Sequence, residues 1–157
     1  MATIPLRTFN VAKTIHGNSP WTLTFPEAAS QTFKLGALVA LDSAGNIAEC
    51  GADPTGILGV VAADASGTTG ADVTVWIADD ETVFVGNLSG TSTSDRRDVG
   101  KGFGVVKTGN NWLIDKTDLA NRRVVIVDLD RRDAVGDTNA REHFVFFSQF
   151  RQLSSTS

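Results

Sequence analysis

The stretch from residue 56 to residue 88 most constrains the fold, because it holds three apolar runs joined by short polar connections. Residues 57–63 are apolar apart from glycine and too few to cross a membrane, which indicates a strand buried on both faces. Residues 72–78 and 81–85 alternate between two faces, as strands do. We therefore predict a three-stranded meander that the other segments cover or extend.

The totals favour one all-β domain. At 157 residues a single chain can bury roughly 68 to 70% of its unfolded surface and needs no disulfide or metal to fold. Glycine (15 residues) and phenylalanine (9 residues) are frequent, methionine occurs once, and no window of 15 residues shows a helical apolar period. We expect a compact β-structure.

Charge and hydropathy limit the classes of partner that the protein can bind. Lys and Arg total 14 against 18 Asp and Glu, and no basic block is present, so we expect no direct contact with nucleic acid. No apolar stretch approaches the roughly 20 residues of a membrane span, and the first residues lack the order of a secretory signal. We expect a soluble protein that stays where it is made, with no membrane partner.

Further strands are expected on both sides of the meander. Residues 21–25 alternate strictly, residues 26–30 permit one helical turn, and residues 33–41 lead through a turn at 42–46 into 47–50. Residues 89–98 are expected to form a mobile surface loop, residues 102–107 and 111–115 a hairpin, and residues 123–129 a strand. For residues 143–153 we favour a strand through about Ser148, although Phe146, Phe150 and Leu153 also fit helical spacing.

The first twenty residues leave two alternatives open. Ile4, Leu6 and Phe9 are isolated apolar residues among polar ones, and turn-forming residues close the segment at Pro20. The segment is either a first strand at a sheet edge or an arm that becomes ordered on a neighbouring subunit. We divide the chain into an N-terminal arm (1–20), a β domain (21–153) and a disordered tail (154–157).

Residues that could perform chemistry are sparse. The only histidines, His16 and His143, lie far apart, and Cys50 has no base near it in the sequence, so no metal-ligand or nucleophile spacing is present. The acidic residues at 79–81 and the mixed Asp and Arg residues at 128–137 are interpreted as solvated turns, and the glycines of GKGFG (100–104) precede a strand. We expect no enzyme, no cofactor and no metal site.

Three tryptophans leave a second function open. Trp21, Trp76 and Trp112 fall on predicted strands, and a shared exposed face would allow them to stack on sugars. Packing in the core is the alternative that we favour. A carbohydrate- or receptor-binding β module is therefore the alternative function.

Three segments together resemble the head decoration, or cement, proteins of tailed double-stranded-DNA bacteriophages. They are FPEAASQTFKLGALVALDSAGNIAECGADPTGILGVVAADA, VTVWIADDETVFVGNL and DVGKGFGVVKTGNNWLIDKTDLANRRVVIVDLD, and the likeness covers about residues 26–147. The resemblance implies a compact β-barrel or tulip-like β domain on the outside of a capsid, as a homotrimer with neighbouring decoration subunits. It implies a virion structural protein, made in the host cytoplasm, whose partner is the major capsid protein; a tail or connector component is a further alternative.

The resemblance also implies that a terminal segment contacts the capsid or a neighbouring subunit. The first twenty residues lie outside the similar region, so their part in this contact rests on their composition. The residues that we expect at the contact are Ile4, Leu6, Arg7, Phe9, Trp21 and Phe150.

Overall fold

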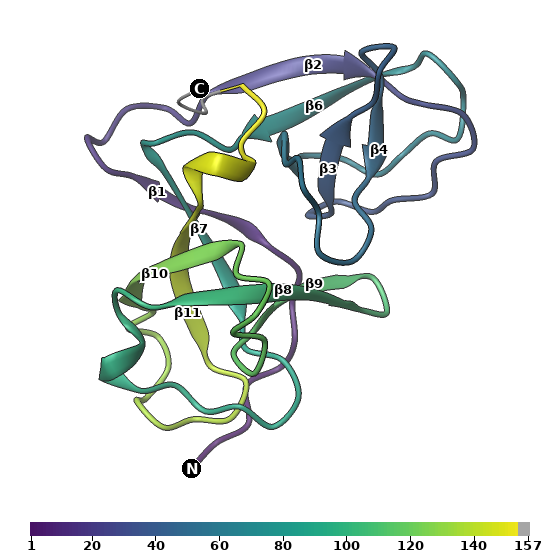
Figure 1. The fold of residues 1–157 in the computed structure, drawn as a ribbon. Coiled ribbons are helices and arrows are strands. Elements are labelled where there is room, and N and C mark those ends of the chain that lie inside the picture. Colours follow the sequence, from purple (N-terminus) through teal and green to yellow (C-terminus); the bar gives the residue numbers. More distant parts are fainter. Residues whose placement is uncertain (154–157) are drawn as a thin grey trace.

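Two antiparallel sheets packed together form the protein (Figure 1). The computed structural model describes residues 1–153. The six-stranded sheet has the order β1 (Asn10–Thr14), β7 (Thr82–Asn87), β11 (Arg141–Phe146), β10 (Val124–Leu129), β8 (Gly102–Thr108) and β9 (Asn111–Asp115). The five-stranded sheet has the order β2 (Thr22–Pro26), β6 (Asp72–Ile77), β5 (Gly59–Val61), β3 (Leu38–Leu41) and β4 (Ile47–Glu49). The all-β class is confirmed, and the pairing among residues 1–153 defines two sheets and not one closed barrel.

The predicted central meander is wrong in its third member. β5 and β6 pair as expected, with Gly59 opposite Ile77, but β7 lies in the other sheet between β1 and β11. The side chain of Asp79 causes the change of direction, because its Oδ1 accepts hydrogen bonds from the backbone N–H of Glu81 (3.0 Å) and Thr82 (2.7 Å). The turn at 79–81 is therefore not simply solvated, since Asp79 is buried within it.

One continuous apolar core joins the two sheets. On the side of the six-stranded sheet it holds a group of four phenylalanines, whose ring centroids lie 4.8 Å apart for Phe9 and Phe144 and 5.2 Å apart for Phe84 and Phe146. All six residues of β7 are buried, because β7 has neighbours on both sides and side chains over both faces. The five-stranded sheet contributes aliphatic side chains, among them Leu38, Val60 and Ile77.

Most of the flanking strands are confirmed, with shorter bounds in the first half. The hairpins β3–β4 and β8–β9 form as predicted, and β2 and β10 follow the predicted strands. The predicted strand at 33–41 begins only at Leu38, because a turn at Gly36 (φ 87°) precedes it. The expected helical turn at 26–30 does not form: Pro26 ends β2, and Glu27 forms a bridge with Ile47.

The C-terminal strand is confirmed but ends two residues early. β11 stops at Phe146, and a 3-10 helix, η2 (Ser148–Phe150), follows. The backbone N–H of Ile57 donates to the carbonyl of Phe150 at 2.7 Å, so the turn attaches the end of the chain to the start of the central stretch. The expected disordered tail, residues 154–157, lies outside the described residues.

The segment at 89–98 is more ordered than a surface loop. It ends in a second 3-10 helix, η1 (Arg96–Asp98), whose capping box joins Asp95 and Asp98 through their side chains and backbone N–H groups. Ser94 and Asp98 are buried. Most of the segment lies at the surface, as expected for a loop, but these two side chains anchor it to the domain.

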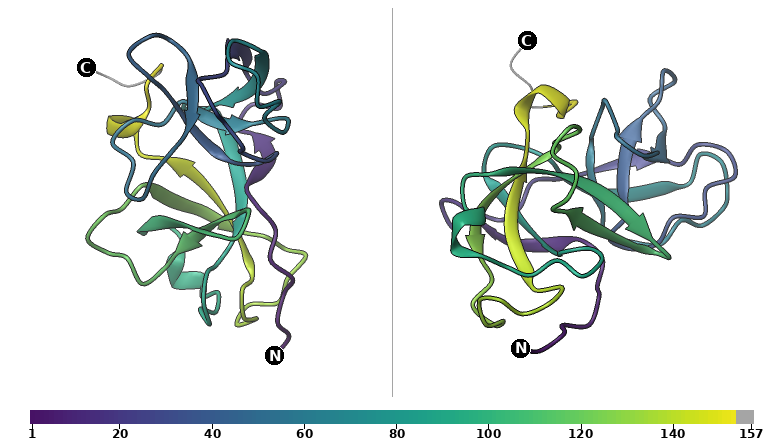
Figure 2. Two further views of the ribbon diagram at one scale, coloured as in Figure 1. Left: turned by 90° about the vertical axis from the view of Figure 1, so that its right-hand side faces the viewer. Right: turned by 60° about the horizontal axis from the view of Figure 1, so that its bottom comes forward.

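The N-terminal segment packs on the domain. Asn10–Thr14 forms the edge strand β1, which pairs with β7, so the first of the two alternatives describes these residues. Closer to the terminus, Ile4 N–H donates to the carbonyl of Thr138 at 2.9 Å, and Figure 2 shows this part running beside the loop that precedes β11. Residues 1–20 thus do not stand apart from the β domain.

Within residues 1–153 the helical segments are the two short 3-10 turns, η1 and η2. No helix among residues 1–153 has the length and apolar character to cross a membrane.

Candidate interaction surface

The residues expected to contact a partner do not form one patch. Phe9 is 1% exposed and belongs to the core, so its assignment as a surface contact is wrong. It lies directly before β1, and its ring packs inward on Phe144. Phe150 is half-buried beneath Arg123, whose guanidinium carbon lies 4.0 Å from the ring centroid. Ile4 is half-buried against the loop before β11, while Leu6 and Trp21 are exposed.

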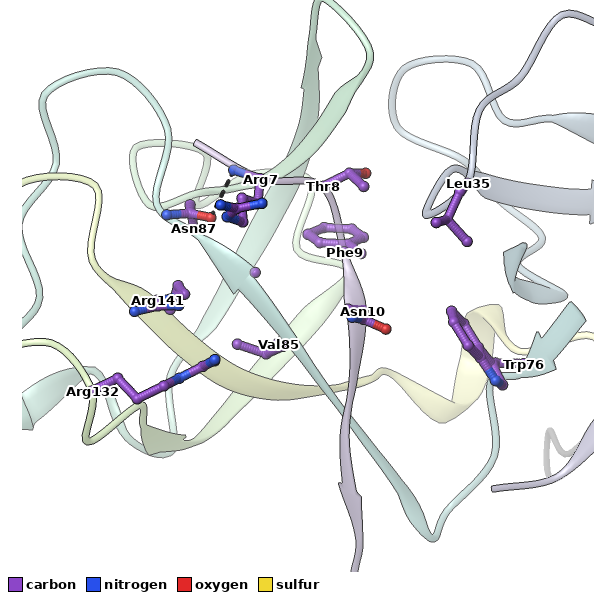
Figure 3. Close-up of a pocket in the computed structure, with 11 residues that line it drawn as sticks. Arg7, Thr8, Phe9, Asn10, Leu35, Trp76, Val85, Asn87, Arg132 and Arg141 are labelled. Carbon is purple, nitrogen blue, oxygen red and sulfur yellow. Dashed lines mark hydrogen bonds between the residues drawn. The ribbon is translucent and has the colours of Figure 1, made fainter. Parts of the chain in front are cut away.

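Arg7 and Phe9 line a groove of about 290 Å³ where the chain entering β1 passes between the sheets (Figure 3). Leu35 and Trp76, from the five-stranded sheet side, form an apolar wall. Arg132 and Arg141 lie at the other end, near the loop before β11 and at its first residue. The groove therefore has an apolar end and a basic end.

Two of the groove's arginines are already neutralised. Arg132 lies 2.6 Å from Asp130, and Arg141 lies 2.6 Å from Asp133. The hydrogen bond from Arg132 holds the pKa of Asp130 well below its usual range despite partial burial, and the hydrogen bond to Asp133 raises the pKa of Arg141. These pairs fix the basic wall in place and leave it little net charge.

Arg7 differs from these two arginines. Its backbone N–H donates to Asn87 Oδ1 at 3.0 Å, which fixes the main chain, while its side chain is exposed. Among residues 1–153 no hydrogen bond or ion pair is formed by its guanidinium. Arg7 is thus available to bind a carboxylate of a partner that enters the groove.

A longer surface lies along the edges of both sheets. β1 and β2 are the terminal strands of the six- and five-stranded sheets, and residues 15–21 connect them. This connection carries Ile15, which is 56% exposed, and Trp21, which is 41% exposed. We call β1, β2 and residues 15–21 the N-terminal edge.

Edge strands offer unpaired backbone groups to another chain. In β1 the register shifts between Val11 and Lys13, and the exposed Lys13 lies at this irregularity. A bulge and a lysine limit unspecific pairing at an edge. β2 alternates exposed and half-buried residues as far as Phe25, and only Pro26 at its end limits pairing there. The N-terminal edge can therefore receive a partner strand, with apolar contacts at Ile15 and Trp21.

Sequence reasoning missed part of this surface. It identified Arg7 and Trp21 as contact residues. It did not identify Ile15 or Leu35, and it did not predict that Trp76 lines the groove. The exposure of Ile15 has no periodic signal, because the residue lies in an irregular connection. Leu35 lies in a predicted strand that the structure replaces with a turn.

The three tryptophans do not share an exposed face. Trp112 is 2% exposed and donates its indole N–H to Glu49 Oε2 at 3.0 Å. Trp76 is half-buried at the groove, and Trp21 lies on the N-terminal edge. The favoured interpretation, packing in the core, applies to Trp112.

Histidine and cysteine form no reactive set in the described part of the chain. His143 lies 3.2 Å from Asp130, whereas His16 is exposed and lies 4.0 Å from Glu81. Burial, with a smaller contribution from Glu49, raises the pKa of the Cys50 thiol to about 12, so the thiolate that reacts or binds metals does not form at neutral pH. Among residues 1–153 no group of three or more His, Cys, Asp or Glu side chains is placed to hold a metal ion.

The acidic loop at 128–137 neutralises itself, as predicted, but it is less solvated than expected. Asp130 and Asp137 are buried, because each accepts hydrogen bonds from its own loop. In GKGFG, a side chain on Gly104 would meet Asp118, so this glycine makes room for a carboxylate rather than for a phosphate.

No family model matches the chain, and no curated protein matches it either.

Proposed function

We propose that the chain is a non-enzymatic structural protein of a bacteriophage virion, which binds the outside of the capsid and stabilises the head. The resemblance of residues 26–147 to head decoration proteins suggests this role. The observation that supports it best is the N-terminal edge, where two consecutive strands end both sheets and exposed apolar side chains lie between them.

The physical requirements of such a protein suit this edge. A decoration protein holds shell subunits together by adding buried area, and a specific interface buries about 1,600 Å² in total. Strand addition at β1 or β2 would supply backbone hydrogen bonds, while Ile15 and Trp21 would supply apolar anchors. The partner at this edge is the major capsid protein.

The groove is a second place where a partner can bind, and its lining residues indicate the chemistry of that partner. A segment with an apolar side chain and a carboxylate would place the first against Leu35 and Trp76 and the second on Arg7. A neighbouring decoration subunit in a trimer would make such a contact head-to-tail, which closes by three-fold rotation.

The experiment measures binding to purified shells that lack the protein, by co-sedimentation. Ile15→Ser and Trp21→Ala together should reduce occupancy at least tenfold, because both anchors are lost while the backbone hydrogen bonds at these residues remain. Leu119→Ser is the matched control, since Leu119 is 55% exposed, like Ile15, but follows β9 at the far end of the six-stranded sheet.

Deleting residues 2–18 would not test this function cleanly, because it removes Phe9 from the core together with β1. Wild-type protein that does not sediment with shells would contradict the proposal. Its presence in tails or connectors of purified particles would favour the tail alternative, and shifts of Trp fluorescence across a glycan panel would favour the carbohydrate alternative.

A further inference from the structure

Three ionisable side chains from different parts of the chain come together beside the six-stranded sheet. Asp98 belongs to η1, Lys116 directly follows β9, and Glu142 lies in β11. Lys116 Nζ lies 2.8 Å from Asp98 Oδ2, and the Asp98 side chain is 2% exposed. We call these residues the Asp98–Lys116–Glu142 cluster.

Glu142 is the unusual member. It is completely buried, and in the described part of the chain neither carboxyl oxygen accepts a hydrogen bond. A buried carboxylate without donors is strongly unfavourable, so such a group takes up a proton. Burial, followed by the neighbouring Asp98 side chain, raises the pKa of Glu142 to about 9. At neutral pH Glu142 is therefore a neutral acid next to the Asp98 carboxylate, with a proton that it can donate.

This arrangement places an amine 2.8 Å from a buried carboxylate and a buried acid beside that carboxylate. We propose that Lys116 and Asp98 become joined by an intramolecular isopeptide bond after folding, with Glu142 as the acid–base residue of the reaction. The fold holds the two reacting groups next to each other, so they do not have to meet by diffusion. This raises their effective concentration and lowers the barrier to bond formation.

The reaction balances without any other reactant. Within the ion pair the Lys116 ammonium gives one proton to the Asp98 carboxylate, which leaves a neutral amine and a neutral acid. The lone pair of Nζ then forms the bond to Cγ of Asp98, while Glu142 donates to a carboxyl oxygen and later takes back a proton. The C–O bond breaks and one water molecule leaves, so an ammonium and a carboxylate become an amide and water.

The surroundings favour each step. Asp98 Oδ2 also accepts the backbone N–H of Asp95 at 3.0 Å, which stabilises negative charge on that oxygen as Nζ attacks. The Asp98 side chain is 2% exposed, so little water reaches the carboxyl carbon to compete with Nζ. Lys116 Nζ is held in place by the carbonyl of Thr93 at 2.8 Å.

A second lysine pair shows what is specific to this cluster. Lys107 Nζ lies 2.8 Å from Glu49 Oε1, the same distance, but the Glu49 side chain is 20% exposed. Its other oxygen accepts the indole N–H of Trp112, and no buried neutral acid contacts the pair within residues 1–153. We expect no bond there, so Lys107 provides the control.

The test is mass spectrometry of the purified full chain under denaturing conditions. The wild type should be lighter than its sequence mass by one water molecule. A tryptic digest should contain residues 98–101 joined to residues 108–122, because trypsin does not cleave after a modified Lys116. Wild-type protein at its full sequence mass, with linear peptides 98–101 and 108–116, would overturn the proposal whether or not any variant folds.

Variants assign the roles. Lys116→Arg should restore the full mass, and Lys107→Arg should keep the loss of water. Glu142→Gln should leave most of the chain without the bond, at least tenfold less than the wild type over the same time. Complete bond formation in Glu142→Gln would overturn the role of Glu142, and a loss of water that persists in Lys116→Arg would overturn the assignment to Lys116.

Discussion

Two buried glutamates, one beside each sheet, have opposite protonation. Glu27 follows β2 at the five-stranded sheet and accepts hydrogen bonds from the Ser66 N–H (2.9 Å), the Ser66 hydroxyl (2.8 Å) and the Gly67 N–H (3.1 Å). Glu142, in the six-stranded sheet, accepts none among residues 1–153. Both side chains are removed from water, so the difference comes from the donors that each one meets.

The two pKa values move apart for this reason. Burial raises the pKa of Glu27, but the hydrogen bonds from Ser66 and Gly67 outweigh it and leave the pKa below its ordinary value. For Glu142, burial and the Asp98 carboxylate act in the same direction. A loop supplied with donors thus keeps an ionised acid at one sheet, while the interior of the other sheet keeps a neutral one.

The largest expected effect concerns Glu142, compared in a Lys116→Arg background so that no covalent bond contributes. Because its pKa is raised from 4.5 to about 9, the folded state binds more protons than the unfolded state between these values, and stability falls as pH rises through them. We expect Glu142→Gln to remove a loss on the order of 4 kcal/mol between pH 5 and pH 8. Urea unfolding at both pH values measures this loss. If the free energy of unfolding falls by the same amount from pH 5 to pH 8 in Lys116→Arg and in Lys116→Arg with Glu142→Gln, the assignment is contradicted.

Glycine substitutions extend the comparison to the backbone of each sheet. A Cβ on Gly59, in β5, would lie 1.9 Å from the backbone carbonyl oxygen of Trp76, so the β5–β6 pairing would have to open. A Cβ on Gly86, in β7, would meet the Phe9 ring at 2.6 Å. We expect Gly59→Ala to cost about 3 kcal/mol or more and Gly86→Ala less, since a side chain yields more easily than a paired strand.

Thermal and urea unfolding of both glycine variants show which substitution lowers the free energy of unfolding more. A smaller loss for Gly59→Ala than for Gly86→Ala would show that the five-stranded sheet is the more adaptable of the two.

Glu27→Gln tests the other half of the comparison. Since the pKa of Glu27 is lowered, its contribution to stability is present above the unfolded pKa and is lost as pH falls through the folded one. We expect the substitution to cost about 1 to 3 kcal/mol at pH 7, because the charge-assisted hydrogen bonds are weakened. The difference from the wild type should shrink in acid, and a difference that stays constant down to pH 3 would contradict the mechanism.

The sequence predicted the positions of the strands better than the pairing between them. Alternation and turn residues indicated the hairpins β3–β4 and β8–β9, because both strands of a hairpin are close in sequence. The alternation in β7 could not show that it leaves β6 for the other sheet, since that change depends on hydrogen bonds to Asp79. A side-chain cap of two or three residues has no period to detect.

The two buried glutamates differ in how far the sequence pattern alone could reveal them. Glu142, Phe144 and Phe146 share one face of β11, so an acid on an apolar face was present in the alternation itself. Glu27 follows a proline at the end of a strand, and its donors come from residues about forty positions later. Only the fold brings them together, so local patterns could not reveal this site.

The smallest expected effect dissects the donors of Glu27. Ser66→Ala removes the hydroxyl donor and leaves both backbone donors, so we expect a loss of about 1 kcal/mol at pH 7. The pKa of Glu27 should rise toward its ordinary value, which moves the acid unfolding midpoint to higher pH. Ser43→Ala, at an exposed turn, is the matched control and should change neither quantity. If Ser66→Ala leaves the acid midpoint unchanged, the backbone N–H groups alone determine the protonation of Glu27, and the difference from Glu142 comes from loop conformation instead of side-chain chemistry.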